Sequence, residues 1–176
     1  MADSNITKRA LAAALQKLMA DNSFDKINVG QICQLCGMNR KSFYYHFRDK
    51  YDLLNWIFDT EFIALAAGSG KSSSWDMIEA LCLYFYQNRS FYIKALRTSG
   101  PNSFPEHLRE FCLPLLKNRL KLLMGEAGTD PFILDFYADA FLCAIERWLI
   151  GREPMPPEDF VKKLKLAIHG LAECEI

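Results

Sequence analysis

The sequence predicts an all-α protein in two parts, with about nine helices. Apolar residues recur at helical spacing through nearly the whole chain, and the alternation typical of β-strands is almost absent. Segments rich in Gly and Pro, such as GPNSFP and GREPMPP, separate these stretches. Hydrophobic residues make up 51% and charged residues 24% of the 176 residues, which is ordinary for a folded chain that buries a core.

The first helix is predicted over residues 6–20. Its apolar face consists of five side chains that follow one another at i, i+3, i+4, i+7 and i+8: Leu11, Ala14, Leu15, Leu18 and Met19. The polar run Asp21-Asn22-Ser23 should end this helix. We expect the next two helices to cover its apolar face.

Two short helices with clear cap signals follow. Asn28 and Gln31 have the spacing of a capping box, so a second helix should begin there. It should stop at Gly37, which suits the left-handed position after a helix end. Asn39 can cap a third helix that runs to Phe47. Together with the first helix, four side chains should form a small core: Ile32, Leu35, Phe43 and Phe47.

A fourth helix should begin at Asp49, with Asp52 in its first turn, and continue to about residue 67. The small-residue run GSGKSSS at residues 68–74 is the best candidate for a hinge or domain boundary. Five further helical stretches are predicted after it, at residues 75–88, 90–98, 105–125, 132–150 and 158–174.

The second and third helices, joined by a tight turn, are typical of a helix-turn-helix. Phe43 and Phe47 are four residues apart and should face inward, which turns the neighbouring basic and aromatic side chains outward. A short helix of this kind fits the major groove, where all four base pairs can be distinguished. Residues 1–56 carry eight Lys/Arg and five Asp/Glu, although the whole chain is formally neutral.

The segment INVGQICQLCGMNRKSFYYHFRDKYDLL resembles the DNA-binding signature of the TetR/AcrR family of bacterial transcriptional regulators. The matching positions are Asn28-Val29, Ile32-Cys33, Cys36-Gly37-Met38, Ser42 to Phe47, and Lys50 to Leu53. With the first helix, the resemblance covers about 60 residues. Three small residues depart from the family's usual glycine and alanines: Ser23, Cys33 and Cys36. The resemblance implies a DNA-binding domain at residues 1–48. Residues 49–176 would then form a helical effector-binding and dimerisation domain, with a connecting helix at about 49–67.

The resemblance also implies roles for single residues. Asn28 would cap the second helix and meet a phosphate, while Lys41 and Tyr45 match positions whose base or groove contacts vary with the operator. The full set expected at the DNA is Asn28, Arg40, Lys41, Ser42, Tyr44, Tyr45, His46 and Lys50. Other interpretations stay open: His46 could pack on the fourth helix, Tyr44 could be structural, and Arg40 and Lys50 could be solvated charges.

Dimerisation is implied through the last two long helices. Two apolar stripes suit such an interface: Phe132, Phe136, Ala140, Cys143, Ala144 and Arg147 on one helix, and Phe160, Leu164, Ile168 and Leu171 on the other. A dimer would place two recognition helices in successive major grooves, so the operator should be pseudo-palindromic. Alternatively, both stripes could pack inside one subunit.

Aromatic residues between the two parts suit a small-molecule pocket, although they also suit a plain core: Trp75, Tyr84, Phe85, Phe91, Tyr92, Phe104, His107 and Phe111. The stretches FYIKALRTSGPNSF and DKYDLLNWIF are similar to a TetR-like subgroup related to the activator of dihydroxyacetone kinase genes (DhaS type). In that subgroup the C-terminal domain is thought to receive its signal from a partner protein. The expected partners are therefore operator DNA, a second copy, and either a small-molecule effector or an effector-bearing protein.

Enzymatic and metal-dependent functions are not expected. The chain has no G-x-S-x-G motif and no phosphate loop, and the pair Cys33 and Cys36 lacks two further ligands for zinc. The N-terminal residues lack an apolar leader, and no run reaches about 18 apolar residues, so a cytoplasmic protein without membrane spans is expected. The sequence leaves open the operator, the effector and the sign of regulation, for which repression is the family default.

Overall fold

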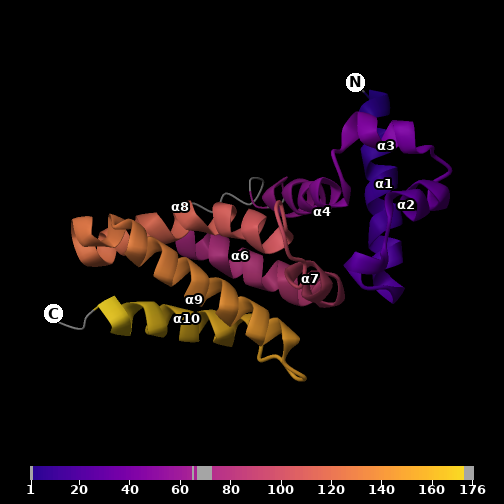
Figure 1. Cartoon of the computed structure of the whole chain (residues 1–176). Helices are drawn as coiled ribbons and strands as arrows, with labels where there is room; N and C mark the ends of the chain where they lie inside the picture. Colours follow the sequence, from indigo (N-terminus) through magenta and orange to yellow (C-terminus); the bar gives the residue numbers. More distant parts are fainter. Residues whose placement is uncertain (1, 65, 67–72, 173–176) are drawn as a thin grey trace. The chain divides into compact units, whose positions relative to one another are not determined.

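The computed structural model describes residues 2–64, 66 and 73–172 (Figure 1). Within them the chain forms nine α-helices, two 3-10 segments and one π-helical turn, and no strand. The all-α fold and the number of helices are thus confirmed. The predicted hinge at residues 68–74 falls mostly outside the described residues, as does Cys174 at the predicted end of the last helix. Among the described residues, no helix combines the length and the apolar character needed to cross a membrane.

The first two helices follow their predicted signals. α1 (Ala2–Asp21) buries its apolar face, and a 3-10 segment (Phe24–Lys26) leads to α2 (Val29–Leu35). Both bonds of the capping box are present: the Gln31 amide donates to Asn28 Oδ1 at 3.1 Å, and the Asn28 amide donates to Gln31 Oε1 at 2.9 Å. This reciprocal pair satisfies two backbone donors at the start of α2 and confirms the predicted cap.

The turn after α2 also has the predicted conformation. Gly37 adopts φ +70°, which other residues rarely tolerate, and Asn39 then caps α3 (Arg40–His46) by accepting from the Ser42 amide at 2.8 Å. Phe43 is fully buried, as predicted. The prediction that Leu35 belongs to the core is wrong, because its side chain is 43% exposed. At 100° per residue, Leu35 falls outside the face of α2 that its buried residues define.

α4 (Lys50–Phe58) begins at the predicted cap, where one carboxylate oxygen of Asp49 accepts from the amides of Tyr51 and Asp52, each at 2.8 Å. The helix passes into a π-helical turn (Asp59–Ile63), which adds one residue to a turn. Phe62 in this turn stacks on Phe58, with ring centroids 5.3 Å apart. The predicted connecting helix is therefore present over its described part.

Contacts divide the chain into two compact units. The N-terminal unit contains the described residues up to Ala64 and also Ser90–Glu106, which holds all but the first residue of α7 (Arg89–Leu96). The C-terminal unit contains the described residues of 65–89 and 107–176. This division differs from the predicted boundary after residue 48, because a segment from the middle of the chain is built into the N-terminal unit.

An aromatic cluster shows how that segment is held. Tyr92 and Phe104 lie 5.4 Å apart between ring centroids, and they lie 6.4 Å and 5.5 Å from the ring of Phe58 in α4. All three side chains are buried. The core of the N-terminal unit is therefore shared between α4 and residues that follow it by more than thirty positions.

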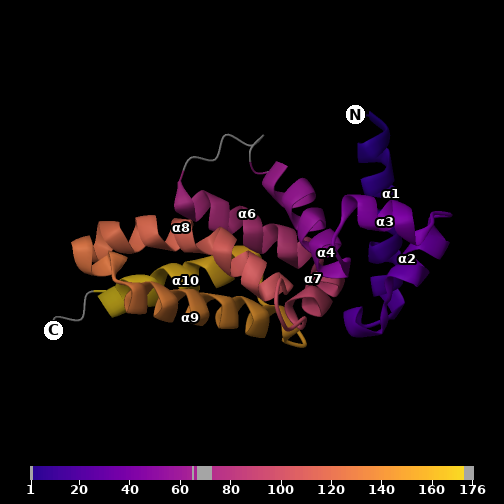
Figure 2. The same ribbon diagram turned by 45° about the horizontal axis from the view of Figure 1, so that its top comes forward.

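The C-terminal unit consists mainly of four helices that lie side by side in Figures 1 and 2. They are α6 (Ser74–Gln87), α8 (Phe104–Met124), α9 (Pro131–Ile150) and α10 (Pro157–Ala172). The first three residues of α8 belong to the N-terminal unit. With α7, they correspond to the five predicted C-terminal stretches. A 3-10 segment (Gly125–Thr129) joins α8 to α9.

The inward face of α10 corrects one prediction. Phe160, Leu164 and Ile168 were expected at a subunit interface, but all three are buried within the chain. Phe160 stacks on Trp148 of α9 with ring centroids 4.3 Å apart and planes nearly parallel. The apolar stripe of α10 is used inside the subunit, and the side chain of Leu171 lies outside the described part.

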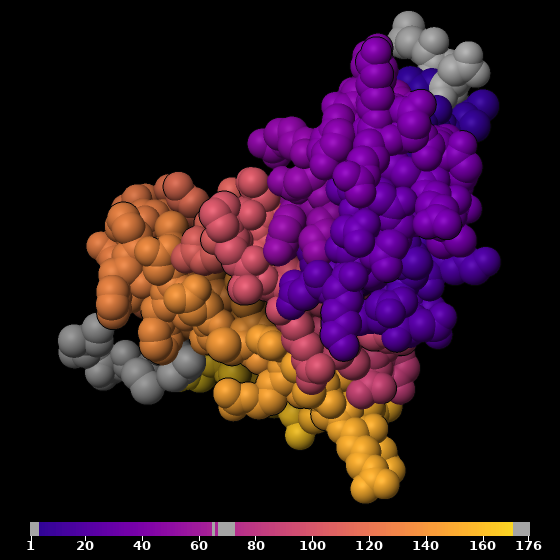
Figure 3. Space-filling model, turned by 45° about the vertical axis from the view of Figure 1, so that its right-hand side comes forward, coloured from indigo at the N-terminus to yellow at the C-terminus, as the bar shows by residue number. Residues whose placement is uncertain are grey.

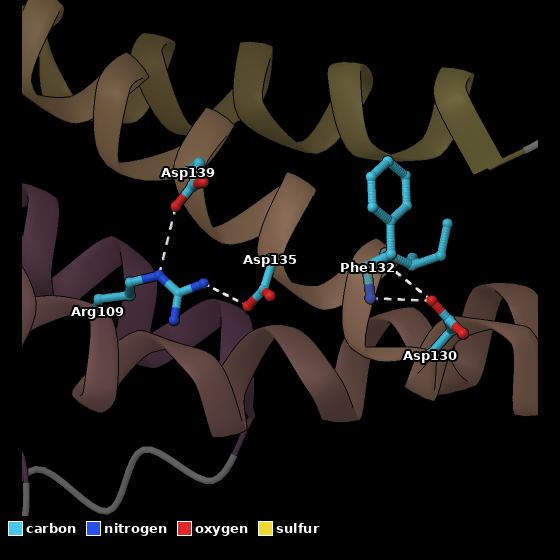
Figure 4. Close-up of polar contacts among 6 residues, drawn as sticks. Arg109, Asp130, Phe132, Asp135 and Asp139 are labelled. Carbon is cyan, nitrogen blue, oxygen red and sulfur yellow. Dashed lines mark hydrogen bonds and ion pairs between the residues drawn. The ribbon is translucent and has the colours of Figure 1, made fainter.

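Polar contacts fix α9 at its start and against α8 (Figure 4). Asp130 caps α9 by accepting from the Phe132 amide at 2.9 Å. Further along, the guanidinium of Arg109 in α8 donates to Asp135 at 2.5 Å and to Asp139 at 3.3 Å. These two carboxylates are four residues apart and share one face of α9, so one arginine pairs with both.

Candidate nucleic-acid interface

α3 carries the most exposed aromatic side chains of the N-terminal unit. Phe43 anchors the helix in the core, and the side chains on its other faces point to solvent. Tyr44 is 58% exposed and Tyr45 is 83% exposed, and Arg40 and Lys41 are exposed as well. In Figure 3, the surface formed by the residues up to the end of α4 is the part coloured from indigo to purple. Aromatic and basic groups with so little burial do not serve the core, and they suit contact with a polyanion.

Two further residues of the predicted DNA-binding set have partners in the helix itself. The Ser42 hydroxyl donates to Asn39 Oδ1 at 3.2 Å, beside the cap bond of its own amide. The half-buried His46 ring meets the Tyr45 ring edge-to-face at 4.9 Å between centroids. Both contacts fix the orientation of α3 side chains.

Lys50 makes contacts that the sequence did not suggest. Its ammonium donates to the carbonyls of Phe24 at 2.9 Å, Asp25 at 3.3 Å and Ile27 at 2.8 Å. It also lies 4.5 Å from the centroid of the Phe24 ring. Burial lowers the pKa of Lys50 below its ordinary value, and the charge of Asp25 opposes that shift. An ammonium has three N–H groups, so these three bonds use all the hydrogen-bond donors of Lys50 within the N-terminal unit.

Two shallow hollows of about 480 Å³ each open beside α2 and α3. The first is also lined by Tyr44 and Lys50, and the second by Met38 and Asn39. Three residues line both hollows: Asn28, Gly30 and Arg40. These three residues therefore occupy the centre of the candidate interface.

Cys33 of α2 and Cys36, the residue after α2, bond to backbone oxygens. Cys33 Sγ lies 3.6 Å from the Asn39 carbonyl, and Cys36 Sγ lies 3.3 Å from the Ile32 carbonyl. Burial raises the pKa of the Cys33 thiol, which keeps it protonated near neutral pH. Among the described residues, no three His, Cys, Asp or Glu side chains gather as a metal site.

The residues predicted to form an effector pocket are divided between the two units. Tyr92 and Phe104 belong to the aromatic core of the N-terminal unit, as described above. Trp75, Tyr84, Phe85, His107 and Phe111 belong to the C-terminal unit. There two cations lie near the Trp75 ring, with Lys165 Nζ 5.3 Å and the Arg119 guanidinium carbon 5.9 Å from its centroid. The pocket stays a prediction for these five residues.

The stripe predicted for dimerisation on α9 faces outward. Phe136 is 53% exposed, and Ala140, Cys143 and Arg147 are exposed as well, while Ala144 is half-buried. Phe132, one turn before Phe136, is 73% exposed. An exposed apolar stripe of this kind on α9 contrasts with the buried stripe of α10.

Sequence reasoning missed three residues: a lysine and an arginine that each cap the end of a helix, and a glycine of α2. Lys94 of α7 donates to the carbonyls of Met19 at 2.6 Å and Ala20 at 2.7 Å, at the end of α1. Arg89 donates to the carbonyls of Leu149 and Gly151, each at 2.7 Å, at the end of α9. These bonds join distant segments, so no local pattern shows them. Gly30 could have been singled out from the sequence, because a glycine inside a helix costs stability and usually has a packing or functional reason.

Two family models match the chain. Residues 10–57 match the model described as "Bacterial regulatory proteins, tetR family". Residues 73–170, more than half of the chain, match the TetR-type model described as "Transcriptional regulator C-terminal region". The two matches together cover the helix-turn-helix and all but the last two described residues of the C-terminal bundle.

A curated relative and three solved structures agree with these matches. The chain is 34% identical over 95 residues to the HTH-type dhaKLM operon transcriptional activator DhaS of Lactococcus lactis subsp. lactis (strain IL1403). That alignment covers 53% of this chain and 51% of the relative, so it spans about half the length of each.

The similar structures share the fold over nearly their whole length. A TetR transcriptional regulator from Streptococcus agalactiae 2603V has a TM-score of 0.72 at 24% identity, with 95% of each chain covered. The dihydroxyacetone kinase operon activator DhaS has a TM-score of 0.59 at 23% identity, covering 94% of this chain and 97% of that one. NalD of Pseudomonas aeruginosa, the secondary repressor of the MexAB-OprM multidrug efflux pump, has a TM-score of 0.61 at 16% identity, covering 97% and 96%.

The geometry and the matches lead to one conclusion. A capped helix-turn-helix presents exposed tyrosines and cations on α3, and the family models cover both this region and the helical bundle that follows. The chain belongs to the TetR family of bacterial regulatory proteins and is a DNA-binding transcriptional regulator.

Proposed function

We propose that the chain binds a pseudo-palindromic operator as a homodimer, with α3 of each copy in the major groove. The observation that carries this proposal is the exposed face of α3, where Tyr44 and Tyr45 stand beside Arg40 and Lys41 on a helix anchored by Phe43. Seven residues give α3 a length of about 10 Å, which suits one groove of B-DNA.

Within this proposal the side chains divide into two groups. Arg40, Lys41 and Tyr45 are exposed and contact base edges. Phosphates are contacted by residues nearer the domain body: Asn28, Ser42, Tyr44 and His46. Lys50 has a positioning role in this scheme, because its three donors already bond to carbonyls. The proposed role places the protein with the chromosome, in the cytoplasm.

The dimer is proposed to form on the exposed face of α9. Phe132, Phe136, Ala140 and Cys143 follow one another at spacings of four, four and three residues, which is one side of a helix. Two exposed phenylalanines one turn apart are an unusual feature for a surface that only meets water. Arg109 pairs with Asp135 and Asp139 beside this stripe and offsets one of their two negative charges, which lowers the cost of covering it.

Control of the C-terminal unit has two candidate forms. The first is a small-molecule effector, which would shift the spacing of the two DNA heads by binding one conformation more tightly. The second is an activator controlled by an effector-bearing partner protein, and the curated relative named as an operon activator favours it. The core position of Tyr92 and Phe104 also favours the second form, since it removes two of the proposed pocket residues.

Fluorescence anisotropy tests the DNA-binding proposal. The purified chain would be titrated against duplexes tiled around its own gene, with excess unrelated duplex and at several salt concentrations. Tight binding to one pseudo-palindromic tile, at two chains per site, is the expected result. Binding at one chain per site would overturn the dimer.

A further inference from the structure

Gly30 lies in the first turn of α2, directly beneath the Arg40 side chain of α3. A Cβ at residue 30 would lie 2.7 Å from Arg40 Nη2 and 3.4 Å from Arg40 Nε. Real Cβ contacts are not that short, so the present position of the guanidinium requires glycine there. Gly30 has no left-handed backbone angle that would explain it otherwise.

The contact between Gly30 and Arg40 lies at the candidate DNA interface. Gly30, Arg40 and Asn28 are the three residues that line both hollows of the candidate interface. Arg40 is the first residue of α3, and its side chain reaches back over α2. The guanidinium thus lies against α2, the first helix of the helix-turn-helix, at the exposed surface.

Orientation matters for arginine more than for lysine. The guanidinium is a planar fork that recognises guanine or phosphate through two parallel hydrogen bonds, so its direction decides which acceptors it reaches. A side chain at residue 30 would turn this fork away from its present direction.

We propose that Gly30 is a specificity-determining residue, because it sets the direction of the Arg40 guanidinium at the DNA. This inference rests on the proposed DNA contact of Arg40. Gly30 itself touches no base in this scheme and acts through Arg40, as a positioning residue.

Substitution by alanine separates this role from folding. The nearest atom is the far end of a flexible arginine, which can move aside at little cost. Alanine is also a better helix former than glycine. Gly30→Ala should therefore melt at the same temperature as the wild type or higher, and yet bind its DNA more weakly.

The contact with the cap needs a control. The same Cβ would lie 3.0 Å from Asn28 Oδ1, the oxygen that caps α2. A change that acted through this cap would lower the melting temperature and would not depend on Arg40. A double-mutant cycle distinguishes the two routes.

The experiment compares four full-length proteins: wild type, Gly30→Ala, Arg40→Ala and the double variant. The DNA is the duplex that the wild type selects from a randomised pool, with an unrelated duplex of equal length beside it. Dissociation constants come from fluorescence anisotropy, and melting temperatures from circular dichroism. The base preference of each variant is read by repeating the selection.

We expect Gly30→Ala and Arg40→Ala each to weaken binding to the selected duplex about tenfold, and the second change to add nothing to the first. Gly30→Ala should also change the selected base at one position, without any loss of melting temperature. Wild-type affinity and base preference in Gly30→Ala, together with weaker binding by Arg40→Ala, would overturn the inference and leave the Arg40 contact intact.

Two other outcomes would also decide the matter. If Arg40→Ala bound the selected duplex like the wild type, the proposed Arg40 contact would fail, and the inference with it. If Gly30→Ala weakened binding equally with and without Arg40, its effect would come from the Asn28 cap, and the positioning role would be wrong.

Discussion

The ammonium of Lys50 joins the start of α4 to the segment before α2. Lys50 donates to three carbonyls of that segment, those of Phe24, Asp25 and Ile27. The Phe24 carbonyl also accepts from the Ile27 amide. The stem of the same side chain places the charge over the Phe24 ring. One residue thus orders the approach to the helix-turn-helix.

Lys50→Met tests this role, because methionine keeps an unbranched stem and loses the donors. The free energy of unfolding should fall by about 1–3 kcal/mol, since three partly buried carbonyls lose a charged donor. Urea titration followed by circular dichroism measures the change. Lys41→Met is the matched control: its ammonium is exposed on α3, so its removal should leave stability within about 0.5 kcal/mol.

Lys50→Met also distinguishes two roles for Lys50: positioning the segment before α2, or binding a DNA phosphate. A lysine that binds phosphate contributes about one unit to the slope of log affinity against log salt concentration. We expect Lys50→Met to leave that slope unchanged once the protein is folded. A slope reduced by about one unit, with normal stability, would show instead that Lys50 binds phosphate as the family resemblance implies.

At the scale of helices, cap signals were readable because they are local. Asn28 and Gln31, Asn39, and Asp49 each lie within three residues of the amides they cap, so the sequence alone predicts their bonds. Three helix starts in the N-terminal unit, those of α2, α3 and α4, were predictable in this way. The side chains proposed to reach DNA follow from the two inward phenylalanines, Phe43 and Phe47.

An apolar stripe is less informative than a cap. The stripes of α9 and α10 both have helical spacing, but the α10 stripe packs inside the chain and the α9 stripe faces outward. The spacing of apolar residues shows that one face of a helix is to be buried, but it does not show which part of the chain or which partner buries that face. The same limit explains Lys94 and Arg89, whose carbonyl partners lie about sixty or more residues away along the chain.

Lys94→Met tests the contribution of α7 to the end of α1. The last carbonyls of a helix have no partner within it, and a cation there also meets the negative end of the helix dipole. Removing the two bonds to Met19 and Ala20 should lower the free energy of unfolding by about 1–2 kcal/mol.

Arg97→Met is the control for the Lys94 variant. Arg97 lines the same hollow of about 300 Å³ as Lys94, but the bonds to the end of α1 come from Lys94. Urea titration should therefore show the larger loss for Lys94→Met. Equal losses would mean that the local positive charge matters and the two carbonyl bonds do not.

At the scale of the molecule, the α9 stripe is the apolar surface most in need of a partner. Phe132 and Phe136 expose 73% and 53% of their surfaces, and covering one phenylalanine contributes about 1.5–3 kcal/mol. In a two-fold interface every contact occurs twice, so one substitution removes two copies of it. Dimerisation is therefore more sensitive to Phe136 than the fold of one chain is.

Phe136→Glu should convert the proposed dimer to a monomer without unfolding the chain. The dissociation constant of the dimer should rise by at least roughly a hundredfold, because two phenylalanines are lost and two carboxylates join Asp135 and Asp139 on the same face. Sedimentation velocity over a range of concentrations measures this change. Leu122→Glu is the control, since Leu122 is 78% exposed but lies on α8.

Cysteine labelling gives an independent reading of the same surface. Cys143 lies on the α9 stripe and is exposed in one chain, so a dimer should slow its reaction with iodoacetamide, and Phe136→Glu should restore it. Cys82 provides an internal standard, because burial raises the pKa of its thiol to about 12 and keeps it unreactive in both proteins. If Cys143 reacted at the same rate in both, and Phe136→Glu sedimented like the wild type, the α9 face would not be the subunit interface.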